Sequence, residues 1–179
     1  MDYILEHKRP QNCEGRLQKE IRVYDLLDRL GIDYYRIDHE ELPTMEACAE
    51  AERALGAQIC KNLLLCNRQK TNFYLLLIPG DKKFETKKLS SQLGVARLSF
   101  ADGEFMEKFL DITPGSLSVF GVANDTENNV RVLIDSDLTK EKYLCAHPCI
   151  NTSTLRINFT DLTEKFLPET KHNYTIVDL

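Results

Sequence analysis

Two apolar runs separated by a short polar segment constrain the fold of this chain most. Residues 59–66 and 73–78 each have the length of one strand and consist almost entirely of apolar side chains. The polar residues 67–72 between them are typical of a hairpin loop, so the pattern predicts two paired strands. Because both runs are apolar along nearly their whole length, we expect the pair at the centre of a sheet.

The rest of the chain mixes helix and strand patterns without a regular repeat. Apolar residues recur at helical spacing from Leu17 to Leu30 and stop at Gly31, and Thr44 is suited to cap a second helix that ends at Gly56. Further helices are predicted at 86–93, 102–110 and 162–166, and further strands at 34–37, 95–100, 130–134, 143–146, 152–157 and 174–177. This order predicts a single α+β domain with a mixed sheet and flanking helices.

Composition excludes several classes of protein. A chain of 179 residues with 42% hydrophobic content can bury one substantial core. The net charge of −5 argues against broad coating of DNA or RNA, although a small local contact with RNA remains compatible with it. Residues 1–15 lack the apolar run of a secretory signal, and no apolar stretch approaches the length that spans a membrane. We therefore expect a cytoplasmic protein whose six cysteines are free thiols.

Several familiar catalytic motifs are missing. No Gly-x-Ser-x-Gly sequence surrounds Ser116 or Ser118, and no Lys follows the glycines as in a phosphate-binding P-loop. Cys145, His147 and Cys149 are the best metal candidates, but no second pair of ligands accompanies them. The sequence therefore predicts neither a metal nor another cofactor.

Three segments remain as candidates for a site. Lys61 and Asn62 open an apolar strand, where an ammonium group must reach a cleft, find a partner or lie at the exposed strand end. The loop 114–121 places small hydroxyl residues between two glycines, so it is either an ordinary turn or a backbone surface that approaches a ligand. His147 begins a segment with Pro148, Asn151 and Thr154, and by itself would be read as a structural histidine.

A fourth segment is basic. Lys82, Lys83, Lys87 and Lys88 flank Phe84. Such charge runs are usually solvated faces, but this one is also the clearest candidate for contact with RNA phosphates.

In order and spacing, Lys61-Asn62, the Gly115 loop and His147-Pro148-x-x-Asn151-x-x-Thr154 together resemble the YbaK/prolyl-tRNA synthetase editing-domain family, and within it the free-standing ProX type. Members of that family hydrolyse amino acids wrongly attached to tRNA. The resemblance covers residues 32–179, so 1–31 is interpreted as an N-terminal helical extension. The chain departs from the family's Gly-x-x-x-Pro loop at one point, since Val119 stands where the Pro is expected.

The resemblance implies a YbaK-like fold with a mainly antiparallel, barrel-like sheet, and it implies roles for individual residues. The catalytic residues would be Lys61, Gly115 and His147; the substrate-binding residues Asn62, Ser116, Ser118, Phe120, Asn151 and Thr154; and the RNA-binding residues Lys82, Lys83, Lys87 and Lys88.

The implied activity is deacylation of mischarged tRNA-Pro at its acceptor end, with alanine as the acyl group and prolyl-tRNA synthetase as a further candidate partner. Two alternatives stay open: a deacylase for Cys-tRNA-Pro or another small aminoacyl-tRNA, and a module that binds aminoacyl-tRNA or a synthetase without turnover.

Overall fold

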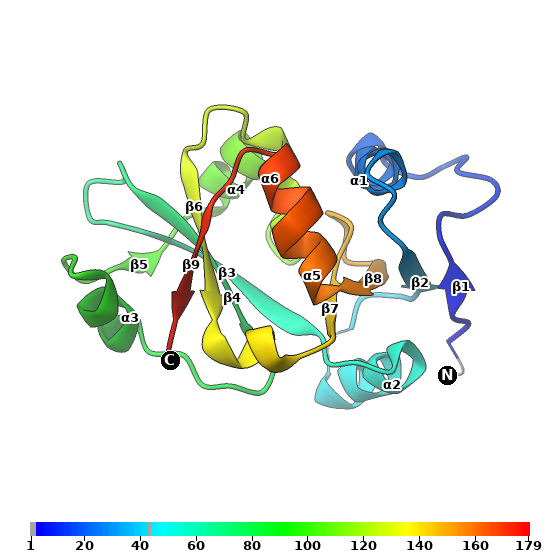
Figure 1. The fold of residues 1–179 in the computed structure, drawn as a ribbon, viewed down its shortest axis with the longest axis horizontal. Coiled ribbons are helices and arrows are strands. Elements are labelled where there is room, and N and C mark those ends of the chain that lie inside the picture. The colour runs from blue at the N-terminus through cyan, green and yellow to red at the C-terminus, as the bar shows by residue number, and fades with distance from the viewer. Residues whose placement is uncertain (1–2, 43) are drawn as a thin grey trace.

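Two separate sheets organise the computed structural model, which describes residues 3–42 and 44–179 (Figure 1). One sheet has the order β1 (Glu6–His7), β2 (Tyr34–Asp38), β8 (Ser153–Asn158) and β7 (Tyr143–Ala146). The other has the order β5 (Ser99–Phe100), β3 (Cys60–Cys66), β4 (Phe73–Pro79), β6 (Val130–Asp135) and β9 (Tyr174–Val177).

The predicted hairpin lies in the middle of the five-stranded sheet. Strands β3 and β4 pair antiparallel from Cys60↔Pro79 to Cys66↔Phe73. The side chain of Asn67 closes the turn by accepting the N–H groups of Thr71 and Asn72. In the described chain only the β4–β6 and β6–β9 pairings are parallel, so the predicted mixed, mainly antiparallel α+β fold is confirmed.

The expectation of a barrel-like sheet is wrong. Within the described chain the two sheets are linked by a single isolated parallel bridge, Ile59↔Cys145, and they do not close into a barrel. A closed barrel would need continuous pairing between β3 and β7. Instead, a large cluster of buried apolar side chains, which we call the main core, lies between the two sheets. Phe120 and Phe166 meet edge to face there, with ring centroids 5.3 Å apart.

Helices cover the sheets on several sides (Figure 1). They are α1 (Gln18–Arg29), α2 (Met45–Leu55), α3 (Thr86–Leu93), α4 (Gly103–Leu110), the 3-10 segments η1 (Val119–Asn124) and η2 (Ser136–Lys140), and a C-terminal helix made of α5 (Phe159–Asp161), η3 (Leu162–Phe166) and α6 (Leu167–Glu169). Helix α1, η1 and the C-terminal helix contribute to the main core. Helix α3 covers the opposite face of the five-stranded sheet, and α2 covers the outer face of the four-stranded sheet.

Local signals fixed most helix ends. The Thr44 hydroxyl caps α2 by accepting the N–H of Ala47, and Gly56 ends the helix with a φ of +66°. The predicted strand at 95–100 is shorter than expected, because the N–H of Leu98 bonds to Ser90 Oγ on α3 and only Ser99–Phe100 pair with β3.

The N-terminal segment is packed against the rest of the chain. Val23, Tyr24 and Leu27 of α1 are buried in the main core, and β1 pairs with β2. The division of the chain at residue 31 stays a prediction, and its first two residues, Met1 and Asp2, lie outside the described residues. Among the helices described, none is long and apolar enough to cross a membrane.

Candidate functional site

Strand alternation directs Lys61 and Asn62 to opposite faces of the five-stranded sheet. Lys61 lies opposite Ile78, on the face that α3 covers, whereas Asn62 lies opposite Leu77, which faces the main core. The side chain of Lys61 is half-buried, and its Nζ donates to the carbonyl of Lys82 at 2.6 Å. Lys61 and Asn62, although adjacent in sequence, therefore contact different parts of the structure.

Lys61 borders a cavity that we call the α2 cavity, with a volume of about 420 Å³. It lies between α2 and the ends of β3 and β4, and its lining is Leu42, Thr44, Cys48, Ala49, Glu52, Gln58, Ile59, Cys60, Lys61, Gly80 and Asp81. An ammonium group has three donors, and one of them is used by Lys82. No other partner of this ammonium group lies among the described residues, so its remaining donors can bind an anionic ligand at the mouth of this cavity.

The side chain of Asn62 is hydrogen-bonded to the candidate loop. Its Oδ1 accepts the N–H of Val119 at 3.0 Å, and its Nδ2 donates to the carbonyl of Cys60. Gly115 has a φ of +92°, a backbone conformation that disfavours any side chain. Within residues 3–42 and 44–179, the N–H groups of Gly115, Leu117 and Ser118 have no hydrogen-bond acceptor. Backbone donors of this kind can bind a carbonyl oxygen or an oxyanion.

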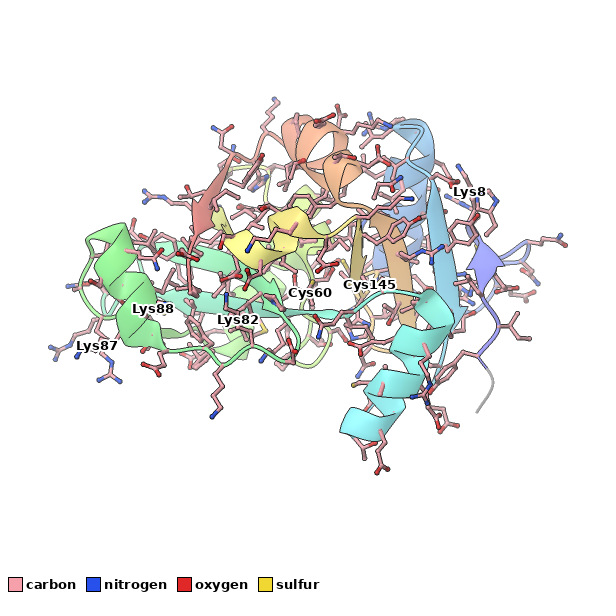
Figure 2. All side chains as sticks on the ribbon, turned by 60° about the horizontal axis from the view of Figure 1, so that its bottom comes forward. Lys8, Cys60, Lys82, Lys87, Lys88 and Cys145 are labelled. Atoms are coloured by element: carbon pink, nitrogen blue, oxygen red, sulfur yellow. The ribbon has the colours of Figure 1, made fainter. Side chains whose placement is uncertain are left out.

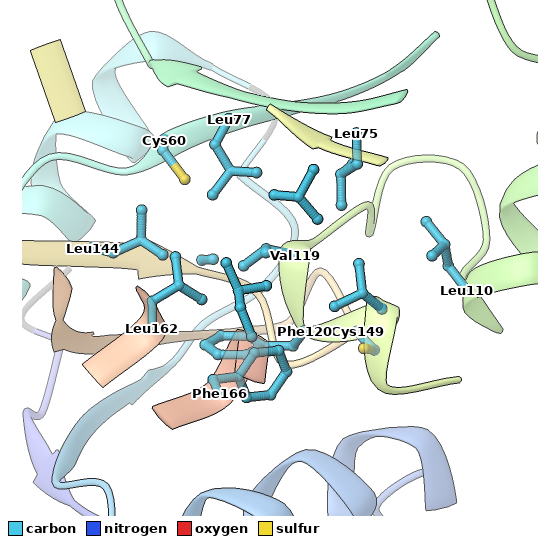
Figure 3. Close-up of a cluster of buried hydrophobic side chains, with 14 of the residues drawn as sticks. Cys60, Leu75, Leu77, Leu110, Val119, Phe120, Leu144, Cys149, Leu162 and Phe166 are labelled. Carbon is cyan, nitrogen blue, oxygen red and sulfur yellow. The ribbon is translucent and has the colours of Figure 1, made fainter. Parts of the chain in front are cut away.

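Two predicted substrate-binding residues lie beneath the loop. Ser118 and Phe120 are fully buried, and Ser118 Oγ caps η1 by accepting the N–H of Phe120. Figure 3 shows Val119 and Phe120 among core side chains, with Phe166 close to Phe120. In this arrangement both residues support the loop from the core, and neither lines a described cavity.

Ser116 and Asn151 line a second hollow, the α1 cavity, with a volume of about 560 Å³. Its lining is Glu14, Gly15, Arg16, Leu17, Lys19, Glu20, Asp38, Thr113, Ser116, Ile150, Asn151 and Thr152. A Cβ at Gly115 would lie 3.8 Å from Asn151 Nδ2, so the loop and Asn151 are neighbours. The structure thus brings Gly115, Ser116 and Asn151 together, and places Lys61 in a different cavity.

His147 belongs to a small polar cluster with His39 and Thr154. Its Nδ1 lies 2.7 Å from the carbonyl of Ser153, while Thr154 Oγ1 lies 2.8 Å from His39 Nε2. The two imidazole centroids are 5.9 Å apart. Burial lowers the pKa of both histidines below the ordinary value, so both are neutral at pH 7. With Nδ1–H donating to Ser153, Nε2 of His147 carries the lone pair.

Comparisons with known proteins identify the family of this chain. Residues 39–165 match the model of the aminoacyl-tRNA editing domain family. The chain belongs to this family.

Relatives of this editing domain have similar length. The prolyl-tRNA editing protein ProX of Acetoanaerobium sticklandii is 31% identical over 153 residues, which are 86% of this chain and 93% of the relative. Prolyl-tRNA synthetase associated domain-containing protein 1 of Danio rerio is 29% identical over 163 residues, 90% of this chain and 86% of the relative. The predicted family is confirmed, and the name of the first relative agrees with the predicted enzyme class, a hydrolase of aminoacyl-tRNA.

A solved structure shows the same fold. It is provisionally described as a trans-editing enzyme for prolyl-tRNA synthetase, and it superposes with a TM-score of 0.65 at 20% identity over 92% of this chain and 99% of its own.

The predicted basic patch of the editing domain divides into two parts (Figure 2). Lys82 Nζ binds Asp135 at 2.9 Å and Asp137 at 2.7 Å, so its charge is already compensated. Lys83, Lys87 and Lys88 are exposed, and no carboxylate in the described chain pairs with them. Of the four lysines in this patch, these three are therefore the ones that can contact phosphate groups.

The three residues considered as metal ligands point to different surroundings. Cys145 lies under α2 with its Sγ 3.9 Å from the carbonyl of Ala57, whereas Cys149 is buried in the main core. His147 binds the backbone of Ser153. All six cysteines are free thiols, as predicted, and no group of three or more side chains suited to a metal occurs in the described part of the chain.

Sequence reasoning missed His39. It follows β2 on the same side as Ile37, and it contacts Thr154, which is 115 residues away in the chain. In the sequence, His39 comes two residues after Ile37, which lies in a predicted strand, and this spacing could have indicated that His39 faces the same side. No nearby residue indicated that its partner would be Thr154.

Proposed function

We propose that this editing domain is a trans-acting deacylase that hydrolyses the ester of mischarged tRNA-Pro, with alanine as the acyl group. The family match and the ProX relative support this proposal. The observation that carries it is the loop at Gly115, which Asn62 holds through the N–H of Val119 and in which the N–H groups of Gly115 and Leu117 have no acceptor among the described residues.

An aminoacyl ester is already an activated acyl group, so hydrolysis requires a placed water and donors for the developing oxyanion. Water adds to the ester carbonyl, and the N–H groups of Gly115 and Leu117 stabilise the oxyanion. His147 Nε2 accepts a hydrogen bond from the attacking water. Collapse of the tetrahedral intermediate breaks the bond to the ribose oxygen, which takes up the proton that the attacking water gives up. The products are the free amino acid and the tRNA, and no step is assigned to a metal or another cofactor.

Lys61 binds the phosphate of the 3′-terminal nucleotide in this proposal, and the ribose of that nucleotide reaches from there to the Gly115 loop. Its ammonium group lies at the edge of the α2 cavity with donors to spare, which suits a phosphate or ribose oxygen. Ser116 and Asn151 shape the amino-acid pocket, Thr154 positions His39 and His147 behind it, and Ser118 and Phe120 support the loop. Lys83, Lys87 and Lys88 contact tRNA phosphates.

Alanine is favoured by the likeness to ProX alone. A single methylene in an apolar pocket discriminates by only about 1–3 kcal/mol, so a pocket for alanine also admits acyl groups of similar size. Cysteine and other small amino acids on tRNA-Pro are therefore the second candidates. A substrate of this kind places the protein in the cytoplasm, with prolyl-tRNA synthetase as a candidate partner.

Deacylation of Ala-tRNA-Pro, Cys-tRNA-Pro and Pro-tRNA-Pro by the purified protein tests the proposal. We expect fast release of alanine, slower release of cysteine, and proline left in place. Binding of Ala-tRNA-Pro without release of any amino acid would identify a binding module and overturn the proposal.

A further inference from the structure

An exposed aromatic side chain stands on the same side of the sheet as Lys61. Phe100 in the edge strand β5 is 59% exposed. It lies opposite Leu65 in β3, and paired residues point to the same face of a sheet. Leu65 and Lys61 are four positions apart in one strand, so they share that face as well.

We propose that Phe100 stacks on a base of the unpaired 3′ end of the tRNA while Lys61 holds the terminal nucleotide. The inference rests on the proposed function. Four strand residues span about 13 Å, which is the length of roughly four stacked nucleotides at about 3.4 Å each. The single-stranded end of a tRNA provides a strand of this length, and aromatic side chains bind such strands by stacking on their bases.

The ring is supported without being buried. Phe84 contacts Phe100 edge to face, with centroids 6.1 Å apart and planes at 75°. Phe84 in turn packs on the cluster beneath α3, so it fixes the position of its neighbour. Lys61 also lies near the segment that carries Phe84, because Lys61 Nζ binds the carbonyl of Lys82, two residues before Phe84.

The charges around Phe100 favour RNA over a protein partner. Arg97 and the lysines Lys83, Lys87 and Lys88 are all exposed, and none has a carboxylate partner among the described residues. Leu98 is bonded to Ser90 of α3, so its neighbour Arg97 is held next to the helix that carries Lys87 and Lys88. In a chain with a net charge of −5, unpaired cations on α3 and on the segments that flank it, together with an exposed ring, match a phosphate backbone with accessible bases.

The experiment compares two substrates that share the ester but differ in length. Phe100→Ala is assayed on Ala-tRNA-Pro and on 3′-alanyl-adenosine, which carries no upstream nucleotide. We expect kcat/KM to fall about tenfold on Ala-tRNA-Pro, equal to about 1.4 kcal/mol and within the range for one stacked base. The value on alanyl-adenosine should stay unchanged, and Phe100→Trp should restore activity on the tRNA.

A matched control lies at the other edge of the same sheet. Tyr174 of β9 is 41% exposed, and Tyr174→Ala should leave both substrates unaffected. Equal activity of Phe100→Ala and wild type on Ala-tRNA-Pro, or an equal loss on both substrates, overturns the stacking role. Failure of the wild type to hydrolyse either substrate instead overturns the proposed function. Affinity for uncharged tRNA-Pro, measured by fluorescence anisotropy, gives the stacking test a readout without hydrolysis, and it should fall in Phe100→Ala alone.

Discussion

Asn62 Oδ1 accepts the backbone N–H of Val119 at 3.0 Å and so ties the start of β3 to the candidate loop. The likeness to other editing domains predicts a Pro at position 119, and a Pro has no N–H to donate. The rigidity that a proline ring would give is replaced here by a hydrogen bond across 57 residues of sequence. Val119 is therefore a matched partner of Asn62.

Introducing the expected proline should harm this protein. Val119→Pro leaves the part-buried Asn62 Oδ1 without its donor, which costs about 1–3 kcal/mol. We expect a lower thermal midpoint and slower deacylation of Ala-tRNA-Pro. Val119→Ala keeps the N–H and serves as the control for lost side-chain packing. Higher activity in Val119→Pro than in Val119→Ala would show that the bond to Asn62 has no role in the loop.

Lys61→Ala should remove most deacylation with little effect on stability. The Lys61 side chain is half-buried, and among the described residues its Nζ binds only the carbonyl of Lys82. Loss of the anchor misplaces the terminal nucleotide, and a misplacement of about 1 Å can reduce the rate by about 10²-fold. The exposed Lys171 offers a matched control in Lys171→Ala. Wild-type turnover by Lys61→Ala on Ala-tRNA-Pro would remove this residue from the mechanism.

Local chemistry made much of the fold predictable. Thr44 and Gly56 fixed the ends of α2, and the apolar runs gave the β3–β4 hairpin. The predictions of the fold that were wrong concern contacts between residues far apart in the chain. The single Ile59↔Cys145 bridge decides between two sheets and a barrel, and Ser90 Oγ shortens β5. Neither effect leaves a periodic signal in the sequence.

In the candidate site, too, some features could be predicted from the sequence and others depend on residues far apart in the chain. Residue type and spacing singled out Lys61, Gly115 and His147, but only the structure shows that Lys82 is paired with Asp135, which lies 53 residues further along the chain. Strand alternation alone predicts that Lys61 and its neighbour Asn62 face opposite sides. That consequence follows from elementary geometry once β3 is recognised.

Stability should fall with pH below about 6.5, the ordinary pKa of histidine. Burial lowers the pKa of His147 and His39, so the unfolded chain binds more protons than the folded protein in this range. Their contribution is complete above the unfolded pKa and is lost as pH falls through the lowered folded pKa. Urea unfolding from pH 7.5 to 5 measures the slope. The decline should be shallower in His147→Gln, and an unchanged slope in that variant would exclude His147 as a source.

Deacylation should persist after prolonged treatment with a chelator. Cys145 and Cys149 lie in different buried clusters, and His147 uses Nδ1 on the backbone of Ser153. The proposed mechanism uses backbone N–H groups for the oxyanion instead of a Lewis acid. Elemental analysis should find no stoichiometric zinc. Activity that chelation abolishes and added zinc restores would contradict this prediction.

The RNA surface should make few phosphate contacts. Because Lys82 is held by Asp135 and Asp137, the three exposed lysines and Arg97 remain, and each neutralised phosphate contributes about −0.7 to −0.9 to the slope of log affinity against log salt. Two to four contacts, an estimate from these cations, predict a slope shallower than about −4.

Lys83→Glu combined with Lys87→Glu should weaken binding of tRNA-Pro, flatten the slope by about 2, and leave the preference between alanine and cysteine intact. Lys140→Glu and Lys165→Glu, at lysines that are already paired with Asp137 and Asp161, form the control pair. A steep slope, or equal weakening by both pairs, would place the RNA-binding surface elsewhere on the molecule.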